Sequence, residues 1–183
     1  MRAGGGWPAT FADVGAAIDH LAVLQRELPL DLGRVVTIGH SAGGHLALWA
    51  GARPGLPDRA PGARPVVRVT HAVAQAGVSD LGEAARLGLG GGAVRRLLGG
   101  TQVERPEPYA LGSPLERLPL GVPQLLVHGE EDDTVPVALS RRYAQAAAAS
   151  GDRVDLSTLS GVAHFEHIDP GSQAWKIVTD WLP

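Results

Sequence analysis

One serine between glycines carries the clearest chemical signal in this chain of 183 residues. Residues 39–43, Gly-His-Ser-Ala-Gly, form a G-x-S-x-G pattern around Ser41. A serine hydroxyl is a poor nucleophile at neutral pH, so it needs a base and a carboxylate that orients the base. The β-branched run at 34–39 predicts a buried strand before Ser41, and residues 41–52 predict a helix after it. Such a sharp turn would lift the hydroxyl clear of a sheet.

The same turn would aim the first N–H groups of the helix at the reacting atom. The Ala42 N–H is the predicted donor to the oxyanion that forms when Ser41 attacks a carbonyl. A structural role for Ser41 is also open, because serine is a favoured N-cap of helices. The residues expected to assist Ser41 favour the role of nucleophile.

Four acidic residues follow the apolar strand predicted at 123–129: Glu130, Glu131, Asp132 and Asp133. Asp132 is the preferred orienting carboxylate, because it stands in an H-G-x-x-D-x-x-V-P run between this strand and a helix predicted at 136–150. Asp133 is the alternative, and its structural role would be to cap that helix. Glu130 and Glu131 are interpreted as solvated charges.

His164 is the predicted base, because it lies in the loop after the strand predicted at 154–159. The chain order serine, acid, histidine, each after a strand, brings the three side chains to one edge of a parallel sheet. His167 is the competing base, and His128 is interpreted as a support of the acid loop. The remaining histidines are interpreted as packing, pocket or surface residues: His20, His40, His45 and His71. No histidine pair follows an H-E-x-x-H spacing, and no metal is predicted.

The elements that must position these residues alternate along the chain. Helices are predicted at 11–28, 41–52, 136–150 and 172–182, the first with Thr10 as N-cap, and strands at 34–39, 66–76, 123–129 and 154–159. This alternation predicts an α/β fold, a parallel sheet with helices on both faces. Residues 1–183 are read as one domain. The Gly- and Pro-rich stretch 82–122 is predicted to be loops with a short helix at 93–98, and to shape the substrate pocket or form a partial lid.

Composition excludes several functional classes. Hydrophobic residues make up 44% and charged residues 19%, the net charge is −3, and there is no cysteine. These values exclude a disulfide framework and a thiolate zinc site, and argue against a nucleic-acid partner. No apolar run is long enough to cross a membrane, and the glycine-rich start has no apolar signal region, so a cytoplasmic location is expected. Residues 4–6 and 88–92 are Gly-rich but lack the strand–loop–helix context of a phosphate loop. No cofactor is implied.

These motifs together resemble the α/β-hydrolase superfamily. Residues 39–46, 128–136 and 161–165 are similar to the serine, acid and histidine segments of its esterase branch, which includes kynurenine formamidase-like and prolyl-oligopeptidase-like hydrolases. The resemblance extends from Gly4 to Leu182. It implies a serine hydrolase that cleaves a small carboxylic ester or amide substrate through an acyl-enzyme. An aryl formamidase and a prolyl-oligopeptidase-type peptidase are the alternatives within this class.

One departure from the family pattern concerns the first thirty residues. They hold a single predicted helix, where the family has several strands and an H-G-G-type loop that donates a second N–H to the oxyanion. The chain is therefore read as N-terminally truncated, with strand 34–39 as an exposed apolar edge that could join two copies into a homo-oligomer. Loss of the second donor would lower turnover by roughly 10²–10³. An inactive chain that acts as an interaction module is the remaining alternative.

Overall fold

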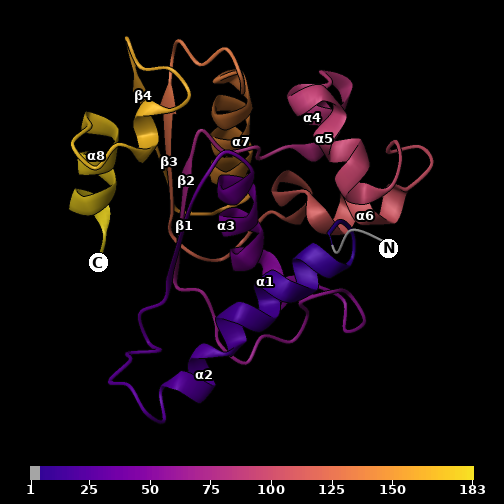
Figure 1. Cartoon of the computed structure of the whole chain (residues 1–183), viewed down its shortest axis with the longest axis vertical. Helices are drawn as coiled ribbons and strands as arrows, with labels where there is room; N and C mark the ends of the chain where they lie inside the picture. Colours follow the sequence, from indigo (N-terminus) through magenta and orange to yellow (C-terminus); the bar gives the residue numbers. More distant parts are fainter. Residues whose placement is uncertain (1–4) are drawn as a thin grey trace.

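Four parallel strands form one sheet in the order of the sequence (Figure 1). The computed structural model describes residues 5–183, so part of the glycine-rich start lies outside the described residues. The strands are β1 (Val36–His40), β2 (His71–Gln75), β3 (Gln124–Gly129) and β4 (Val154–Leu159), and every neighbouring pair is parallel. The predicted α/β fold with a parallel sheet is confirmed.

Helices lie on both faces of the sheet, as Figure 1 shows. They are α1 (Ala9–Asp19), α2 (Leu21–Leu24), α3 (Ala42–Ala52), α4 (Leu81–Arg86), α5 (Leu89–Leu98), α6 (Pro106–Gly112), α7 (Ala138–Ala149) and α8 (Gln173–Trp181), with 3-10 turns at Arg53–Gly55, Pro114–Arg117 and Glu166–Ile168. Helices α3 and α7 pack on one face of the sheet and α8 packs on the other. Within residues 5–183, no helix is both long and apolar enough to cross a membrane.

Three apolar clusters hold these layers together. Leu48 of α3 and Tyr143 of α7 pack against the small residues of β2 on one face of the sheet. On the other face, Val178 of α8 packs against the strand residues of β2 and β3. The third cluster lies away from the sheet, where α1 and α3 meet α4, α5 and α6 around Phe11 and Trp49. This third cluster fixes the helices that surround the serine turn.

The structure corrects several predicted boundaries. The helix predicted at 11–28 ends at Asp19 and continues as the short α2, because the hydrogen bonds shift at His20, whose carbonyl accepts from Val23 N–H. Thr10 lies inside α1 and is not its N-cap; its Oγ1 accepts from Gly6 N–H at 2.9 Å. The strand predicted at 66–76 begins only at His71. Before it, the N–H groups of residues 66 and 67 donate to the carboxylate of Asp19.

The segment 82–122 is more helical than its glycines and prolines suggested. Helix α5 begins at Leu89, earlier than the predicted short helix, and α6 was not predicted at all. Three consecutive glycines, Gly90, Gly91 and Gly92, have φ of 57°, 62° and 85° at the start of α5. They form a left-handed turn that residues with a Cβ would adopt only at a cost. A run of glycines in a sequence usually predicts a loop, whereas here it forms the start of a helix.

Strand β1 is an edge of the sheet, as the sequence indicated. Ile38 in its centre is 39% exposed. A shallow cavity of about 360 Å³ runs along this strand, and its walls are mostly apolar side chains of α1, β1 and α3. The other edge strand, β4, leads directly into the loop that carries His164.

Candidate active site

Ser41 lies in a tight turn between β1 and α3 with an unusual backbone conformation. Its φ is 56° and its ψ is −119°, which is outside the favourable regions for a residue with a Cβ. Backbone hydrogen bonds hold this conformation: Ser41 N–H donates to Gln75 O at 2.8 Å, and Ser41 O accepts from His45 N–H at 3.1 Å. The Ser41 side chain makes no N-cap hydrogen bond. Ser41 thus stands at the N-cap position of α3, but its hydroxyl does not cap the helix.

Two glycines make this turn sterically accessible. A Cβ on Gly39 would collide with the carbonyl of Gly43, and a Cβ on Gly44 would lie 2.9 Å from the Cα of Gly77. Gly39 therefore allows the turn to close, and Gly44 allows α3 to approach the residues after β2. Gly43 differs, because a Cβ there would meet nothing within 4 Å. Of the two glycines that flank Ser41 in the motif, only Gly39 is therefore required by the space around it.

Ala42 is the first residue of α3, so its N–H has no carbonyl of the same helix to donate to. The residue is exposed, and Ser41 beside it is half-buried. The N-terminus of a helix carries a partial positive charge that favours an anion. An oxyanion formed next to Ser41 could thus accept a hydrogen bond from Ala42 N–H.

Asp132 is buried after β3, and both of its oxygens accept hydrogen bonds. Its Oδ1 accepts from the N–H groups of Thr134 and Val135 at 2.9 and 2.8 Å, and its Oδ2 accepts from His164 Nδ1 at 2.7 Å. Burial raises the pKa of Asp132, but the hydrogen bonds from Val135, His164 and Thr134 outweigh it and hold the pKa below its usual range. The carboxylate is therefore ionised at neutral pH.

The bond to Asp132 fixes the tautomer of His164. An ionised carboxylate only accepts, so the proton of His164 is on Nδ1 and the lone pair is on Nε2. This is the form that a general base requires. The ring of His164 is 3% exposed and packs edge-on against Phe165, at 5.1 Å between ring centroids.

His128 supports the acid from the other side. Its Nε2 lies 2.8 Å from Val135 O and 3.2 Å from Asp132 Oδ2, and both of these oxygens are acceptors. Nε2 therefore carries a proton, and Nδ1 accepts from the hydroxyl of Ser140 at 2.7 Å. Burial lowers the pKa of His128, which keeps the ring neutral. The structure agrees with the predicted support of the acid loop.

His40 joins the serine turn to the histidine loop. Its Nε2 donates to the backbone oxygen of His164 at 2.7 Å, and the two rings lie 4.5 Å apart between centroids. Since His40 immediately precedes Ser41, this contact brings the nucleophile candidate and the base candidate to the same place. Within residues 5–183 no hydrogen bond joins the Ser41 hydroxyl to the His164 ring. Such bonds are often long in unliganded enzymes and tighten with substrate.

His167, the competing base, occupies a different environment. It is fully buried, and its Nε2 accepts from Gly129 N–H at 3.2 Å. Its Nδ1 therefore carries the proton, and this atom has no partner in the described part of the chain. Burial and the neighbouring histidines His128 and His40 lower the pKa of His167 to about 4. The geometry gives it no free lone pair to direct at Ser41.

The other acids of the loop also have defined partners. Asp133 accepts from the hydroxyl of Thr134 and caps no helix, so its predicted structural role is wrong. Glu130 accepts from Arg141 at 2.6 Å and from Ser160 at 2.7 Å. Glu131 accepts from the backbone of Gly161 at 3.1 Å. The two glutamates thus connect the acid loop to the loop that leads to His164. Their interpretation as solvated charges did not include these contacts.

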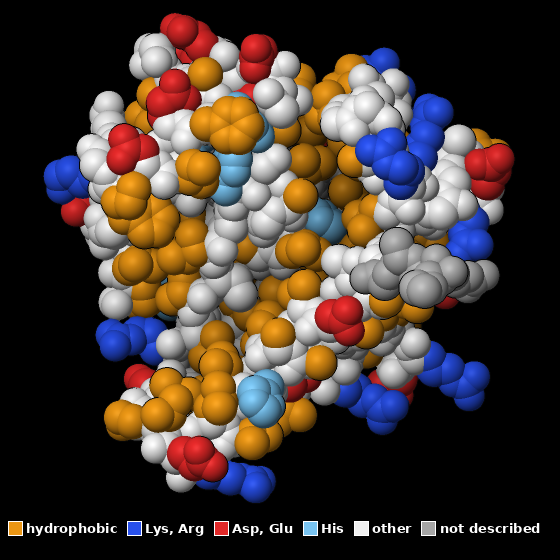
Figure 2. Space-filling model, in the orientation of Figure 1, with side chains coloured by type: hydrophobic (Ala, Val, Ile, Leu, Met, Phe, Trp, Pro, Cys, Tyr) orange, Lys and Arg blue, Asp and Glu red, His pale blue; other side chains and the backbone are white. Residues whose placement is uncertain are grey.

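A cavity of about 320 Å³ opens beside Ser41, between the serine turn and α4–α5. Most of its wall is apolar, with Val78, Leu81, Val94 and Leu97 among the lining residues. Figure 2 shows hydrophobic side chains gathered in the hollow of this face. His45 is also in the wall, and burial lowers its pKa to about 4. The cavity suits an uncharged group attached to the atom that Ser41 would attack.

Sequence reasoning missed residues that act on the site through the backbone. Gln75 is one: its carbonyl accepts from Ser41 N–H, and its Nε2 donates to His167 O at 2.8 Å. Thr134 is another, because its amide holds the acid. Its only sequence signal is the aspartate two residues before it, a spacing typical of Asx turns. No local pattern marks Gln75, since its role depends on strand pairing.

Comparison with known proteins assigns most of this sequence to a family. The family described as BD-FAE matches residues 2–146, a stretch that includes Ser41 and Asp132. No curated protein sequence matches the chain.

Many solved structures share the fold of this chain. A truncated form of a carbohydrate esterase from gut microbiota is 23% identical, with a TM-score of 0.78 over 97% of this chain and 68% of its own. An acetyl ester-xyloside bifunctional hydrolase from Caldicellulosiruptor lactoaceticus is 26% identical, with a TM-score of 0.73 over 96% of this chain and 64% of its own. A thermophilic esterase from the Planctomycetes species Thermogutta terrifontis, with butyrate bound, is 25% identical, with a TM-score of 0.73 over 98% of this chain and 65% of its own. The chain thus spans about two thirds of the length of these neighbours.

Proposed function

The chain belongs to the BD-FAE family, and from that premise we propose that it is a serine esterase. Ser41 is the nucleophile, His164 the general base and Asp132 the residue that orients the base. The hydrogen bond of 2.7 Å between His164 Nδ1 and Asp132 Oδ2, beside a serine in a strained turn, is the observation that carries this proposal.

In the first half of the reaction, Ser41 Oγ attacks the ester carbonyl as its proton passes to His164 Nε2. The negative charge moves to the carbonyl oxygen, which accepts from the Ala42 N–H. Asp132 stabilises the positive charge that His164 then carries. As the tetrahedral intermediate collapses, the C–O bond to the alcohol breaks and His164 gives its proton to the leaving alkoxide. An acyl group remains on Ser41.

In the second half, water attacks the acyl-enzyme and His164 Nε2 takes its proton. Collapse of the second tetrahedral intermediate breaks the bond to Ser41 Oγ, which regains its proton from His164. The acid product leaves.

The preference for esters over amides rests on the structural neighbours. The three structural neighbours are described as esterases or ester hydrolases, and none as a formamidase or a peptidase. The cavity beside Ser41 is apolar and fits an uncharged part of the substrate. We take the segment 82–122 to shape this substrate cavity, because α5 supplies five of its twelve lining residues. We take the alcohol part to be carbohydrate, as in the hydrolase that is described as acting on acetyl esters and xylosides.

Turnover of p-nitrophenyl acetate tests this proposal. We expect hydrolysis by the chain and none above background by Ser41→Ala, with circular dichroism spectra that show both proteins folded. A folded chain whose slow hydrolysis is unchanged by Ser41→Ala would exclude Ser41 as the nucleophile. A folded chain without turnover would instead favour the alternative of an inactive interaction module.

We also propose that β1 can pair two copies of the chain. The support is the position of β1 at the sheet edge and the 39% exposure of Ile38. Light scattering after size exclusion should then report a dimer that Ile38→Lys converts to a monomer. A monomer before the substitution would contradict this proposal. The cytoplasmic location and the lack of a nucleic-acid partner stay predictions from the sequence.

A further inference from the structure

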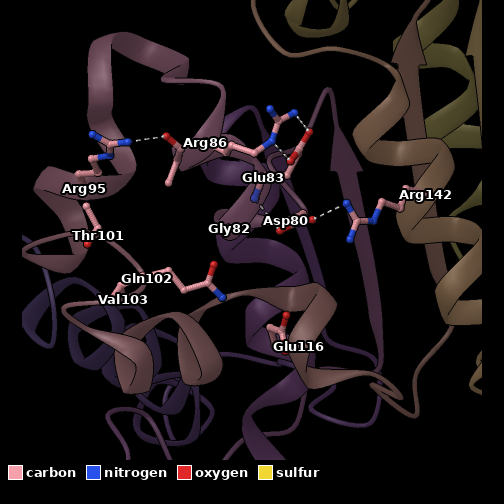
Figure 3. A pocket seen from close by; sticks show the side chains of 11 residues that line it. Asp80, Gly82, Glu83, Arg86, Arg95, Thr101, Gln102, Val103, Glu116 and Arg142 are labelled. Carbon is pink, nitrogen blue, oxygen red and sulfur yellow. Dashed lines mark hydrogen bonds and ion pairs between the residues drawn. The ribbon is translucent and has the colours of Figure 1, made fainter.

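A second, polar cleft lies on the opposite side of α4 from the cavity beside Ser41. Its volume is about 430 Å³, within the range of small-molecule sites. Leu81 faces the apolar cavity, and the next two residues of the helix, Gly82 and Glu83, face the cleft. Figure 3 shows side chains from α4, α5, α7 and the loop after α5 directed toward this space.

Positive and negative charges are balanced in the cleft. Three arginines and three acids line it: Arg86, Arg95, Arg142, Asp80, Glu83 and Glu116. Their formal charges cancel, and Figure 3 shows Glu83 against Arg86 and Asp80 facing Arg142, with Glu116 apart from both pairs. Arg86 is held by both carboxylate oxygens of Glu83, at 2.6 and 2.7 Å. A net-neutral surface of this kind attracts neither an anion nor a cation strongly, because each meets a like charge nearby.

Several polar groups of the cleft have unused hydrogen-bonding capacity. Within residues 5–183, the side chains of Gln102 and Glu116 make no hydrogen bond. Arg95 makes one long bond, 3.5 Å to the carbonyl of Ala85, and Arg142 makes one ion pair, 3.5 Å to Asp80. A guanidinium has five N–H donors, so most of the donors of both arginines are unused. The cleft thus offers donors and acceptors side by side.

We propose that this cleft binds a neutral polyhydroxy ligand, a sugar ring. A sugar hydroxyl both donates and accepts, so it can bridge a guanidinium and a carboxylate or an amide without adding charge. This inference rests on the proposed function, since it assigns to the cleft a sugar unit of the carbohydrate ester whose reactive group lies at Ser41. The two spaces share no lining residue, so the cleft would receive a sugar unit other than the one whose ester lies at Ser41.

Direct binding tests the cleft independently of ester cleavage. The Ser41→Ala protein, which cannot turn over a substrate, is titrated with methyl xyloside and methyl glucoside, and in parallel with phosphate and citrate. NMR chemical shifts or calorimetry report the affinity. We expect saturable binding of at least one glycoside in the millimolar range and no comparable binding of the anions. Loss of a hydrogen bond in Gln102→Ala or Glu116→Ala should weaken glycoside binding about 3- to 10-fold.

Two further variants make the test specific. Glu116→Gln keeps an acceptor and should retain most of the affinity. Gln145→Ala removes a glutamine on α7 that does not line the cleft, and should bind as the parent protein does. Gln102 lies on the surface, so its variant should keep the parent unfolding temperature. No saturable binding of either glycoside, preferential binding of an anion, or equal affinity in Gln102→Ala and Gln145→Ala would each overturn the proposal. Ester turnover can persist in all three cases, so failure here is distinct from failure of the proposed function.

Discussion

The two halves of the candidate site are held in place by different means. Asp132 and His164 lie in loops after β3 and β4, and side-chain hydrogen bonds fix both of them. Ser41 lies after the edge strand β1, and only backbone bonds fix it. Its hydroxyl has no hydrogen-bond partner in the described part of the chain.

The acid–base pair and the nucleophile therefore owe their reactivity to different features of the structure. The acid and the base need defined protonation states, and buried hydrogen bonds supply these by favouring one charge and one tautomer. The nucleophile needs an accessible oxygen in a fixed direction, which a strained turn supplies without covering the atom. A substitution that disturbs the backbone should therefore have its largest effect in the turn around Ser41. Substitutions of side chains around Asp132 should lower activity in steps, according to how many hydrogen bonds each one removes.

The largest expected effect comes from a single methyl group in the serine turn. Gly39→Ala places a Cβ against the carbonyl of Gly43, where no flexible side chain can move aside. We expect loss of soluble folded protein, or a fall in the unfolding temperature together with loss of esterase activity. Gly43→Ala is the matched control, because its Cβ meets nothing within 4 Å. Thermal unfolding of both variants checks this, and similar unfolding temperatures would contradict the steric account of the turn.

The next largest effect concerns the acid. Asp132→Asn keeps the shape of the side chain, but it loses the charge and favours the wrong tautomer of His164. We expect kcat for p-nitrophenyl acetate to fall by about 10⁴ with the fold retained. Asp133→Asn is the control, because among the described residues the Asp133 side chain hydrogen-bonds only to Thr134. If Asp133→Asn lost more activity than Asp132→Asn, the assignment of the acid would be wrong.

The buried His45 and the buried Asp132 should make stability depend on pH in different pH ranges. Burial lowers the pKa of His45, on the serine side, from 6.5 to about 4. Between these values the unfolded chain binds a proton that the folded chain does not, so stability falls as pH falls from 6.5 to 4. His45 alone accounts for a loss on the order of 3 kcal/mol. Urea unfolding at pH 7 and pH 4.5 should show a smaller pH effect in His45→Gln than in the parent protein.

The pKa of Asp132, on the acid side, is lowered as well, but from the lower starting value of a carboxyl group. Its contribution to stability is present above its unfolded pKa near 3.8 and is lost only as pH falls through the folded value. The stability difference between the parent protein and Asp132→Asn should therefore be constant from pH 7 to pH 5 and should shrink below pH 4. A difference that shrank between pH 7 and pH 5 would contradict the lowered pKa.

The smallest expected effect concerns the support of the acid. His128→Asn removes one of the donors to Asp132 and leaves those of Thr134, Val135 and His164. We expect kcat to fall about 3- to 10-fold, in proportion to one hydrogen bond. His71→Asn is the control, because His71 contacts Thr70 and Trp181 and no group of the site. Equal activities of the two variants would exclude a role for His128 in positioning Asp132.

The same contrast explains what the sequence could predict. Ser41, Asp132 and His164 each follow a predicted strand in a short motif, so their types, order and common edge could be predicted from local patterns. The parallel sheet followed from the alternation of strands and helices. Contacts between distant segments had no such signal: the bond from His40 to the His164 backbone and the bond from Ser41 to Gln75 exist only once the strands pair.

The segment 82–122 was the hardest to predict, for a physical reason. Glycine and proline are typical of loops, and the start of α5 uses Gly90, Gly91 and Gly92 for a left-handed turn that opens a helix. Propensity alone cannot distinguish that turn from an irregular loop. The polar cleft behind α4 was missed as well, because its residues come from separate stretches between positions 80 and 142 and meet only in the folded chain.

Covalent labelling tests the central claim, that Ser41 is the nucleophile, most directly. The folded chain is treated with a fluorophosphonate, which phosphonylates activated serines, and the modified residue is identified by peptide mass spectrometry. The account predicts one adduct, on Ser41, with labelling slowed in Asp132→Asn and absent in Ser41→Ala. Labelling of a different residue, or none in a chain whose circular dichroism shows it folded, would contradict it.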